Sequence, residues 1–345
     1  AAVIAGFGAM NGAQAKEKIT IGSAVSWPGY SFYELVRQMD MAPDYELEVI
    51  SLNDPLAGYA MLAAGQLDIF VSTLEYSPVA VEQGHPFVQT TYTNTSYGVD
   101  HIVLNAGMTP QDLKGKRVSA PTLFIGHLLM GVWLDSVGIT PDEVDWINLA
   151  ADEAAGAMLA GDIAAGYLYE PWSTSVQENL EGSQLITTSI EPMYLKNAMF
   201  ADSIYMNKDF IADRRGAAID MMRVYWDSRG YWNQHVEEVN QIFSDYLQWP
   251  IEDVGWVVST NGKEIEGGLY MYDFDEAARF CGVLDGAPPF DQANGGLVQT
   301  VADTNDWWIK LGIMETKIDA SEAVDCSIMG DLVAEGYRQS FGANE

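Results

Sequence analysis

The stretch KITIGSAVSWPGYSFYEL, residues 18–35, contains the features that decide the fold. It begins with a short apolar run typical of a β-strand, passes through a Trp-Pro-Gly-Tyr turn, and ends in a segment of helical character. Ser31 with Glu34 three residues later fits a capping box, so we expect a helix to start near Ser31. The turn is unusual because it places Trp27 and Tyr30 where chains commonly have small polar residues.

Strand-like and helix-like segments continue to alternate along the chain. YELEVISL at 45–52 is followed by DPLAGYAMLAAG at 54–65 and LDIFVS at 67–72. Short β-branched runs separated by helical segments are typical of βαβ units, in which helices cover a parallel sheet. Ser77-Pro78 marks another predicted helix start in this series.

A second copy of the pattern follows at a shift of 97 residues, the difference between positions 50 and 147. The shift places Ile50 on Ile147, and AMLA at 60–63 on AMLA at 157–160. Both copies continue with Gly and an acidic residue. We therefore expect two similar α/β lobes, since two copies are too few for a solenoid.

The chain changes character from about Asn207, where long helical stretches with few strand signals begin. The predicted fold class is thus α/β with two lobes, each a mainly parallel sheet flanked by helices, and a helical C-terminal part. We assign residues 16–104 and 203–345 to lobe 1 and residues 105–202 to lobe 2. The chain is expected to cross between them near residues 103–108 and 199–204.

Composition restricts the partners. The chain has 345 residues with 17 basic and 49 acidic side chains, a formal net charge of −32. Nucleic acids and anionic membranes need clustered Lys and Arg, so neither is expected as a partner. The acidity fits either a solubilising surface or attraction of cationic ligands.

The N-terminus resembles the end of a secretory signal. Residues 1–15 are rich in Ala and Gly and end in Ala-Gln-Ala, a pattern that signal peptidases cut. We expect this remnant to be removed and the mature chain to begin near Lys16. No later stretch offers the ~18–20 apolar residues that a membrane-spanning helix needs, so a protein that is not membrane-embedded is expected. Cys281 and Cys326 allow one disulfide, and the sequence leaves its formation open.

Short enzyme motifs are missing from the sequence. There is no G-x-S-x-G, no phosphate-binding G-x-x-x-x-G-K-[ST] and no H-E-x-x-H, and the four histidines are scattered. The segment MYDFDEAAR lacks the Gly and closing Glu of a calcium loop. We therefore expect no enzyme activity, no cofactor and no metal site.

Aromatic and acidic residues gather in loops at the predicted carboxyl ends of strands, where open α/β sheets bind ligands. Each aromatic taken alone also fits a core position, but their concentration in both lobes favours a cleft. Aromatic rings beside carboxylates suit a cationic or amine-bearing ligand. The candidate contacts are Trp27, Tyr30, Glu75, Tyr76, Tyr97, Asp100, Phe124, His127, Tyr169 and Glu170.

Several motifs together resemble a known family. They are KITIG, SWPGY, AMLAAGQLDI, DLKGKRVSAP, GITPDEVDWINL, MLAGDIAAGYLYEPW and YMNKDF, in order over roughly residues 16–215. The chain is similar to periplasmic substrate-binding proteins of ABC importers for taurine, alkanesulfonates, nitrate and thiamine-pyrimidine precursors. The resemblance implies a type II-like periplasmic-binding-protein fold, a ligand between the lobes and hinge closure.

The resemblance adds Asp202 as a candidate contact, because taurine-type members have an acid there for the ligand's amine. It also reveals a departure. Sulfonate binders of the family place a Ser-Thr run before the His, whereas this chain has Phe124, Ile125 and Gly126 before His127. Missing hydroxyl donors disfavour a plain sulfonate or nitrate, since each unsatisfied buried group costs about 1–3 kcal/mol.

The predicted function is therefore that of a periplasmic, monomeric binding protein. It would capture a small amine-bearing solute, taurine-like or a quaternary amine, and deliver it to a separate ABC permease and its ATPase. A pyrimidine or thiamine precursor, or a sulfonate, is the alternative ligand. A pyrimidine-synthesis-type enzyme on the same fold and a sensor subunit are the alternative roles.

Overall fold

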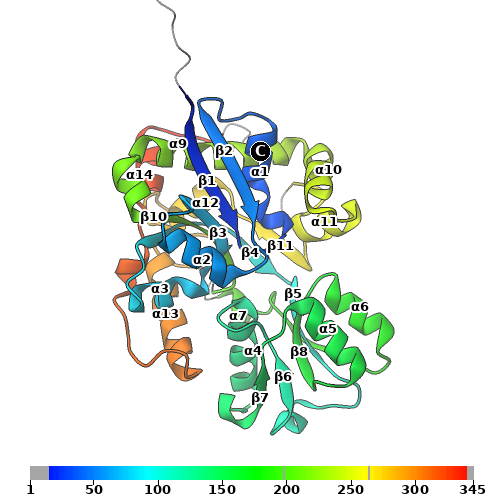
Figure 1. Ribbon diagram of the computed structural model, residues 1–345. Helices are drawn as coiled ribbons and strands as arrows, with labels where there is room; N and C mark the ends of the chain where they lie inside the picture. The colour runs from blue at the N-terminus through cyan, green and yellow to red at the C-terminus, as the bar shows by residue number, and fades with distance from the viewer. Residues whose placement is uncertain (1–14, 197–198, 263–264, 340–345) are drawn as a thin grey trace, which may run out of the picture.

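Two α/β lobes make up the computed structural model, which describes residues 15–196, 199–262 and 265–339 (Figure 1). Within these residues the strand order of sheet 1 is β11-β4-β10-β3-β1-β2, and that of sheet 2 is β7-β6-β8-β5-β9. The predicted two-lobed α/β fold is confirmed. The expected signal remnant, residues 1–15, lies almost wholly outside the described residues.

Each sheet combines a parallel trio with antiparallel strands. β1 pairs in parallel with β2 and β3, and β6 pairs in parallel with β7 and β8. β10 runs antiparallel to β3 and β4, β11 antiparallel to β4, and β5 antiparallel to β8 and β9. Most strands of each sheet therefore run in one direction, and the sheets are mixed because β10 and β11 in sheet 1 and β5 in sheet 2 run the opposite way. The strands are β1 (Glu17–Ser23), β2 (Tyr45–Ser51), β3 (Ile69–Thr73), β4 (Phe87–Tyr97), β5 (Asp100–Leu104), β6 (Arg117–Ser119), β7 (Asp145–Ile147), β8 (Ala165–Tyr169), β9 (Gln184–Thr188), β10 (Ala201–Asn207) and β11 (Gly268–Met271).

The internal repeat is visible in the topology. The trio β2-β1-β3 of sheet 1 corresponds in order and direction to β7-β6-β8 of sheet 2. Helix α2 (Pro55–Ala63) connects β2 to β3, and α5 (Ala151–Ala160) connects β7 to β8 in the same way. The matched AMLA segments lie at the carboxyl ends of these two helices. The repeat in sequence therefore reflects a repeated β-α-β-α-β unit.

The chain first crosses between the sheets at Gly98 and Val99, between β4 and β5. Gly98 has a φ of 107°, and a Cβ there would lie 2.9 Å from the backbone nitrogen of Gly267, so only glycine fits this crossing. The expected first crossing at 103–108 is too late, because the apolar run after Asp100 forms a strand of sheet 2. The return lies between β9 and β10, and the assignment of other residues to lobes remains a prediction.

Helices cover both sheets and form the C-terminal part, as expected. Helix α9 is the longest of those described and packs against α1. Cys281 after α12 and Cys326 before α14 form a disulfide with a Cα–Cα distance of 5.6 Å. The remaining helices are α1 (Phe32–Gln38), α3 (Ser77–Glu82), α4 (Ile125–Ser136), α6 (Trp172–Asn179), α7 (Pro192–Leu195), α8 (Lys208–Asp213), α9 (Arg215–Gln234), α10 (Val236–Leu247), α11 (Ile251–Val258), α12 (Phe274–Phe280), α13 (Leu297–Lys310) and α14 (Ser327–Ala334).

The first helix starts where expected but without the capping box. The Ser31 hydroxyl donates to the Trp27 carbonyl at 3.1 Å, and Glu34 pairs with Arg37 instead of reaching back. Phe32 on the next position packs against rings of Tyr225, Trp232 and Phe243 at centroid distances of 5.1–5.9 Å. These ring contacts hold the start of α1 in place without a side-chain cap. The Ser31 hydroxyl instead forms its hydrogen bond within the Trp-Pro-Gly-Tyr turn.

One C-terminal helix touches both lobes. Helix α13 lies beside α3 of lobe 1 and reaches α4 of lobe 2 (Figure 1). The ring of Trp308 contacts that of His127, and the Lys310 ammonium lies 2.6 Å from the Asp135 carboxylate. None of the described helices is long and apolar enough to cross a membrane.

Candidate ligand site

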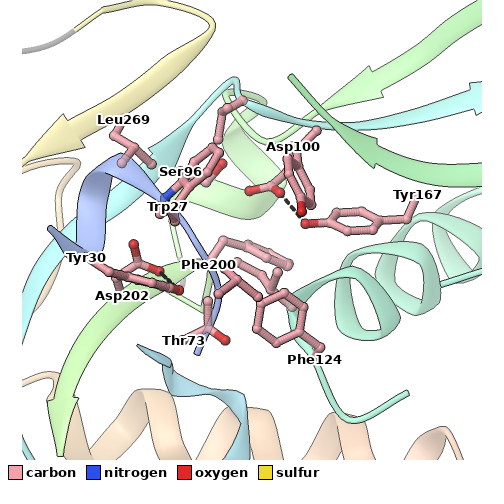
Figure 2. Close-up of a pocket in the computed structure, with 14 residues that line it drawn as sticks. Trp27, Tyr30, Thr73, Ser96, Asp100, Phe124, Tyr167, Phe200, Asp202 and Leu269 are labelled. Carbon is pink, nitrogen blue, oxygen red and sulfur yellow. Dashed lines mark hydrogen bonds between the residues drawn. The ribbon is translucent and has the colours of Figure 1, made fainter. Parts of the chain in front are cut away.

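A cavity lies between the two sheets, at the ends of strands from both lobes (Figure 2). Its empty volume is about 390 Å³, the opening to solvent included. Because this volume counts open solvent at the mouth, the enclosed space is smaller, and only a small ligand is indicated. The lining residues are Val25, Trp27, Tyr30, Thr73, Ser96, Val99, Asp100, Phe124, Ile125, Tyr167, Tyr169, Phe200, Asp202 and Leu269.

Lobe 1 contributes a hydrogen-bonded tyrosine–aspartate pair. The Tyr30 hydroxyl donates to Asp202 Oδ1 at 3.0 Å, and both side chains are buried. Tyr30 belongs to a single 3-10 turn, Pro28–Tyr30, whose proline and glycine fold the chain back toward the sheet. Gly29 leaves no room for a side chain there, since a Cβ would lie 2.9 Å from Leu269. Asp202 is held by β10, between β3 and β4.

Lobe 2 contributes a second pair of the same kind. The Tyr167 hydroxyl donates to Asp100 Oδ1, joining β8 to β5. The Tyr167 ring lies against the first turn of α4 at Gly126, where an added Cβ would come within 2.2 Å of it. Glycine at position 126 therefore makes room for the ring. The Tyr167 ring thus gives a physical reason for the glycine in the Phe-Ile-Gly sequence before His127.

Aromatic rings from both lobes meet at the cavity. The Trp27 and Tyr169 rings lie edge to face with centroids 5.4 Å apart, one from each lobe. Trp27 also contacts Trp249, at 5.9 Å. Phe124 and Phe200 complete the aromatic wall, and Figure 2 shows Trp27 and Phe200 between the two Tyr–Asp pairs. Such faces can contact a cation or an apolar chain.

The described residues that line the cavity include two acidic side chains and no basic one. Burial raises the pKa of Asp202 to about 7, opposed by hydrogen bonds from Asn94 and Tyr30, and burial also raises the pKa of Asp100. Among the described residues that line the cavity none is Lys, Arg or His. The ion pairs found in the described ranges do not include Asp100, Asp202 or Glu75. A cationic ligand would therefore meet carboxyl groups without a protein counterion.

Six of the eleven candidate residues meet at this cavity. They come from segments far apart in sequence, which supports the expectation that aromatic and acidic loop residues converge. Their role as ligand contacts remains a prediction. The six are Trp27, Tyr30, Asp100, Phe124, Tyr169 and Asp202.

Glu75 and Tyr76 lie in lobe 1 outside the cavity lining. Glu75 is fully buried, accepts a hydrogen bond from Thr73, and burial raises its pKa to about 8. Tyr76 stacks on Tyr59 at a centroid distance of 4.1 Å. Both residues belong to the 3-10 turn Leu74–Tyr76 after β3, and both side chains pack inside lobe 1. Tyr76 finds a stacking partner there in the aromatic core of that lobe.

The other three candidates outside the lining have partners of their own. Tyr97 contacts the rings of Tyr270 and Phe290. Glu170 accepts hydrogen bonds from the backbone and hydroxyl of Thr174 at the start of α6, and its carboxylate lies 3.7 Å from His101. His127 is enclosed by Trp146 and Trp308, and burial lowers its pKa to about 4, so it is neutral near pH 7.

Sequence reasoning missed eight lining residues, of which four carry polar groups or large rings: Thr73, Ser96, Tyr167 and Phe200. One of them had a signal in the sequence. Tyr167 is two positions before Tyr169 on β8, so the two side chains share a face of that strand, whereas Phe200 lies just before β10 and had no such signal. Thr73 and Ser96 become recognisable only when the strand ends are known. In the described part of the chain, no three His, Cys, Asp or Glu side chains are grouped to hold a metal ion.

Comparison with known proteins decides the family. A model described as NMT1/THI5 like matches residues 44–238, more than half of the chain. The chain belongs to the NMT1/THI5-like family. This confirms the resemblance found in the sequence, and the match covers all residues assigned to lobe 2 together with part of lobe 1.

A curated relative is the taurine-binding periplasmic protein of Escherichia coli K12. It is 26% identical over 191 residues, which cover 52% of this chain and 58% of the relative. The match therefore spans little more than half of that protein.

Solved structures share the fold. The alkanesulfonate-binding protein SsuA from Xanthomonas axonopodis pv. citri, bound to MOPS, has a TM-score of 0.68 at 13% identity, with 90% of this chain and 99% of that chain covered. The desulfurization enzyme DSZB has a TM-score of 0.60 at 11% identity, with coverages of 93% and 100%. Binding proteins and an enzyme thus use this architecture, and at these identities the likeness shows the fold alone.

Proposed function

We propose that this protein is an extracytoplasmic solute-binding protein that captures a small amine-bearing organic solute between its lobes. The ligand class is taurine-like or quaternary ammonium, and the loaded protein delivers it to an ABC permease served by a separate ATPase. The taurine-binding periplasmic relative and the family membership support a binding role in the periplasm. We further propose that the protein acts as a monomer.

The observation that carries the proposal is the chemistry of the cavity. Two buried carboxyl groups, Asp100 and Asp202, line it together with rings from both lobes, and no basic side chain lines it in the described ranges. A cation between aromatic faces gains roughly 0.5–2 kcal/mol per ring. A hydrogen bond from an ammonium to a carboxylate adds about 1.5–3 kcal/mol. Contacts of this kind would favour an amine over an anion in the cavity.

A plain sulfonate or nitrate fits this lining less well. Its oxygens would face carboxyl groups and rings, and the α4 N-terminus beside the cavity carries Phe124, Ile125 and Gly126 without a side-chain hydroxyl. A flat pyrimidine remains the alternative ligand, because stacked contacts with Trp27 or Phe200 would suit its ring.

The enzyme alternative has less support. DSZB shows that the fold can host catalysis. Here, however, both cysteines are joined in the disulfide, and the two non-tyrosine hydroxyls of the described lining belong to Thr73 and Ser96. The Ser96 hydroxyl is hydrogen bonded to that of Ser189. His101 directly follows the lining residue Asp100, and burial lowers its pKa. This arrangement provides no activated nucleophile with an adjacent base.

A thermal-shift screen tests the proposal. Protein purified free of ligand would be heated with taurine, alkanesulfonates, betaine, choline, short amines, polyamines and pyrimidines. A ligand at 100 times its dissociation constant stabilises a protein by about 2.7 kcal/mol, which is readily detected. We expect stabilisation by amine-bearing compounds and a smaller response to sulfonates that lack an amine. Stabilisation by pyrimidines or amine-free sulfonates alone would contradict the proposal.

A further inference from the structure

The cavity has two acidic ends, one in each lobe. Tyr30 and Asp202 form the first within lobe 1, and Tyr167 and Asp100 form the second within lobe 2. Neither hydrogen bond crosses between the lobes. Figure 2 shows the two pairs on opposite sides of the cavity, with Trp27 and Phe200 between them.

The charge of these ends is not balanced by the protein. Both carboxyl groups are at least nine-tenths buried, and neither takes part in an ion pair within the described ranges. The titratable group nearest in sequence is His101 beside Asp100; burial lowers its pKa, and its ring nitrogen faces Glu170 at 3.7 Å. A ligand with one positive charge would pair with one carboxyl group and leave the other either protonated or buried without a counterion, whereas a second cationic nitrogen would give both carboxylates a partner.

Much of the remaining lining is apolar. Val25, Val99, Ile125 and Leu269 contribute aliphatic surface to the cavity, in addition to the aromatic wall. A hydrocarbon linker suits this surface, because burying methylene groups against it is favourable. A sulfonate at the far end from Asp202 would instead meet the carboxyl group of Asp100.

We propose that the ligand carries two positively charged nitrogens, one held by Asp202 and Tyr30 of lobe 1 and the other by Asp100 and Tyr167 of lobe 2. Within the amine-bearing class of the proposed function, this replaces a taurine-like or quaternary amine by a short aliphatic diamine. The inference rests on the proposed function, because it takes the cavity as the ligand site. A molecule with two cationic ends would contact both lobes at once and so favour the closure that the family resemblance implies.

Matched pairs of amines test the inference. Ligand-free protein would be titrated calorimetrically near pH 8 with ethane-, propane-, butane- and pentanediamine, with the monoamine of each chain length, and with taurine. A diamine of suitable length should bind at least tenfold more tightly than its monoamine, which exceeds the statistical factor of about two for two equivalent ends. The length that binds best then measures the separation of the carboxylates.

The variant Asp100→Asn locates the second end. It should reduce the preference for the diamine to about twofold and lower monoamine affinity as well, by about the statistical factor of two, because only the Asp202 end remains. Asp245→Asn on the exposed face of α10 should leave both affinities intact. If Asp100→Asn fails to fold, the wild-type comparison still decides.

The outcomes separate the two proposals. Monoamines that bind as tightly as every diamine, or taurine that binds more tightly than all of them, would overturn the diamine inference and leave the amine-binding function standing. Failure of every amine to bind would overturn both.

Discussion

At the scale of single residues, Asp202 carries most of the proposed selectivity. It is buried, hydrogen bonded to Tyr30 and placed on a strand between the two halves of sheet 1. The carboxylate form is the one that attracts a cation, so the same side chain that favours an amine disfavours a sulfonate.

We predict that Asp202→Asn weakens binding of an amine ligand by about ten- to a hundredfold, because the charge-assisted hydrogen bond of about 1.5–3 kcal/mol is lost. The folded state should persist, since the amide keeps the shape of the carboxyl group. Calorimetric titration gives the affinity and circular dichroism the fold. The surface variant Asp245→Asn is the control, and unchanged affinity in Asp202→Asn would remove this residue from the site.

We predict that Gly126→Ala weakens binding at least tenfold by displacing Tyr167. The new methyl group would overlap the ring, which lies 2.2–2.5 Å from the ideal Cβ position, and such overpacking costs about 1–3 kcal/mol. Gly156→Ala is the matched control, because α5 leaves open space around that glycine. It should stabilise the fold by up to about 1 kcal/mol and leave binding unchanged.

The site could be predicted in part from its residues. Trp27 and Tyr30 were recognisable because large side chains in a strand-to-helix turn are unusual, and Asp202 because of the family resemblance. Glu75, Tyr76 and His127 were predicted in the same way but are packed elsewhere. The Glu75 carboxyl group is buried beside Thr73, Tyr76 stacks on Tyr59, and His127 contacts Trp146 and Trp308. Sequence gives the position of a loop residue along the chain, whereas the side on which it packs depends on distant helices.

At the scale of elements, α13 is the part of the fold that the sequence did not place. Its helical pattern was clear, but its position against both α3 and α4 depends on contacts far apart in sequence. Trp308 donates from Nε1 to the Glu75 carbonyl at 2.7 Å and contacts His127 across the lobes. The helix therefore anchors the turn after β3 and reaches lobe 2 at the same time.

We predict that Trp308→Phe lowers the free energy of unfolding by about 1 kcal/mol through loss of this hydrogen bond, and that Trp308→Ala lowers it by about 3–5 kcal/mol. The neighbouring Trp307 is only partly buried, so Trp307→Phe should change stability by less than about 0.5 kcal/mol. Urea unfolding followed by circular dichroism measures all three. Equal effects at both positions would show that α13 does not anchor the turn.

The strands were predicted well where their pattern repeated and less well at the crossings. The repeat correctly indicated two units with the order strand, helix, strand. The boundary near residue 104 was wrong because β5 follows β4 after two residues and joins the other sheet. Both segments are apolar and extended, so nothing local distinguishes a strand that continues a sheet from one that enters the next.

At the scale of the whole molecule, buried acids make stability depend on pH. Folding raises the pKa of Glu75 to about 8 and that of Asp202 to about 7, so the folded chain binds these protons more tightly than the unfolded chain. Their contribution to stability is therefore complete below about pH 4 and is lost as the pH rises through about 7 to 8.

We predict that the ligand-free protein loses a few kcal/mol of stability between about pH 5 and pH 8.5, and that Glu75→Gln combined with Asp202→Asn reduces this loss. Repulsion within a chain of net charge −32 acts in the same direction, so the difference between the two proteins is the quantity that reports on the acids. Urea unfolding at each pH measures it, and identical pH profiles would contradict the assignment.

Binding of an amine should follow the opposite trend. A cation prefers the deprotonated site, so its affinity should rise from about pH 6 to pH 8.5 as Asp202 loses its proton. Calorimetric titration at several pH values measures this trend. Affinity that is constant or falls over that interval would show that the ligand does not interact with this carboxyl group.

A crystal structure of the protein with the amine that stabilises it most tests directly whether a small organic cation binds between the lobes. We predict an ammonium nitrogen within hydrogen-bond distance of Asp202, with rings from Trp27 and Tyr169 around the ligand. Density for the ligand elsewhere, or an anionic group next to Asp202, would contradict this prediction.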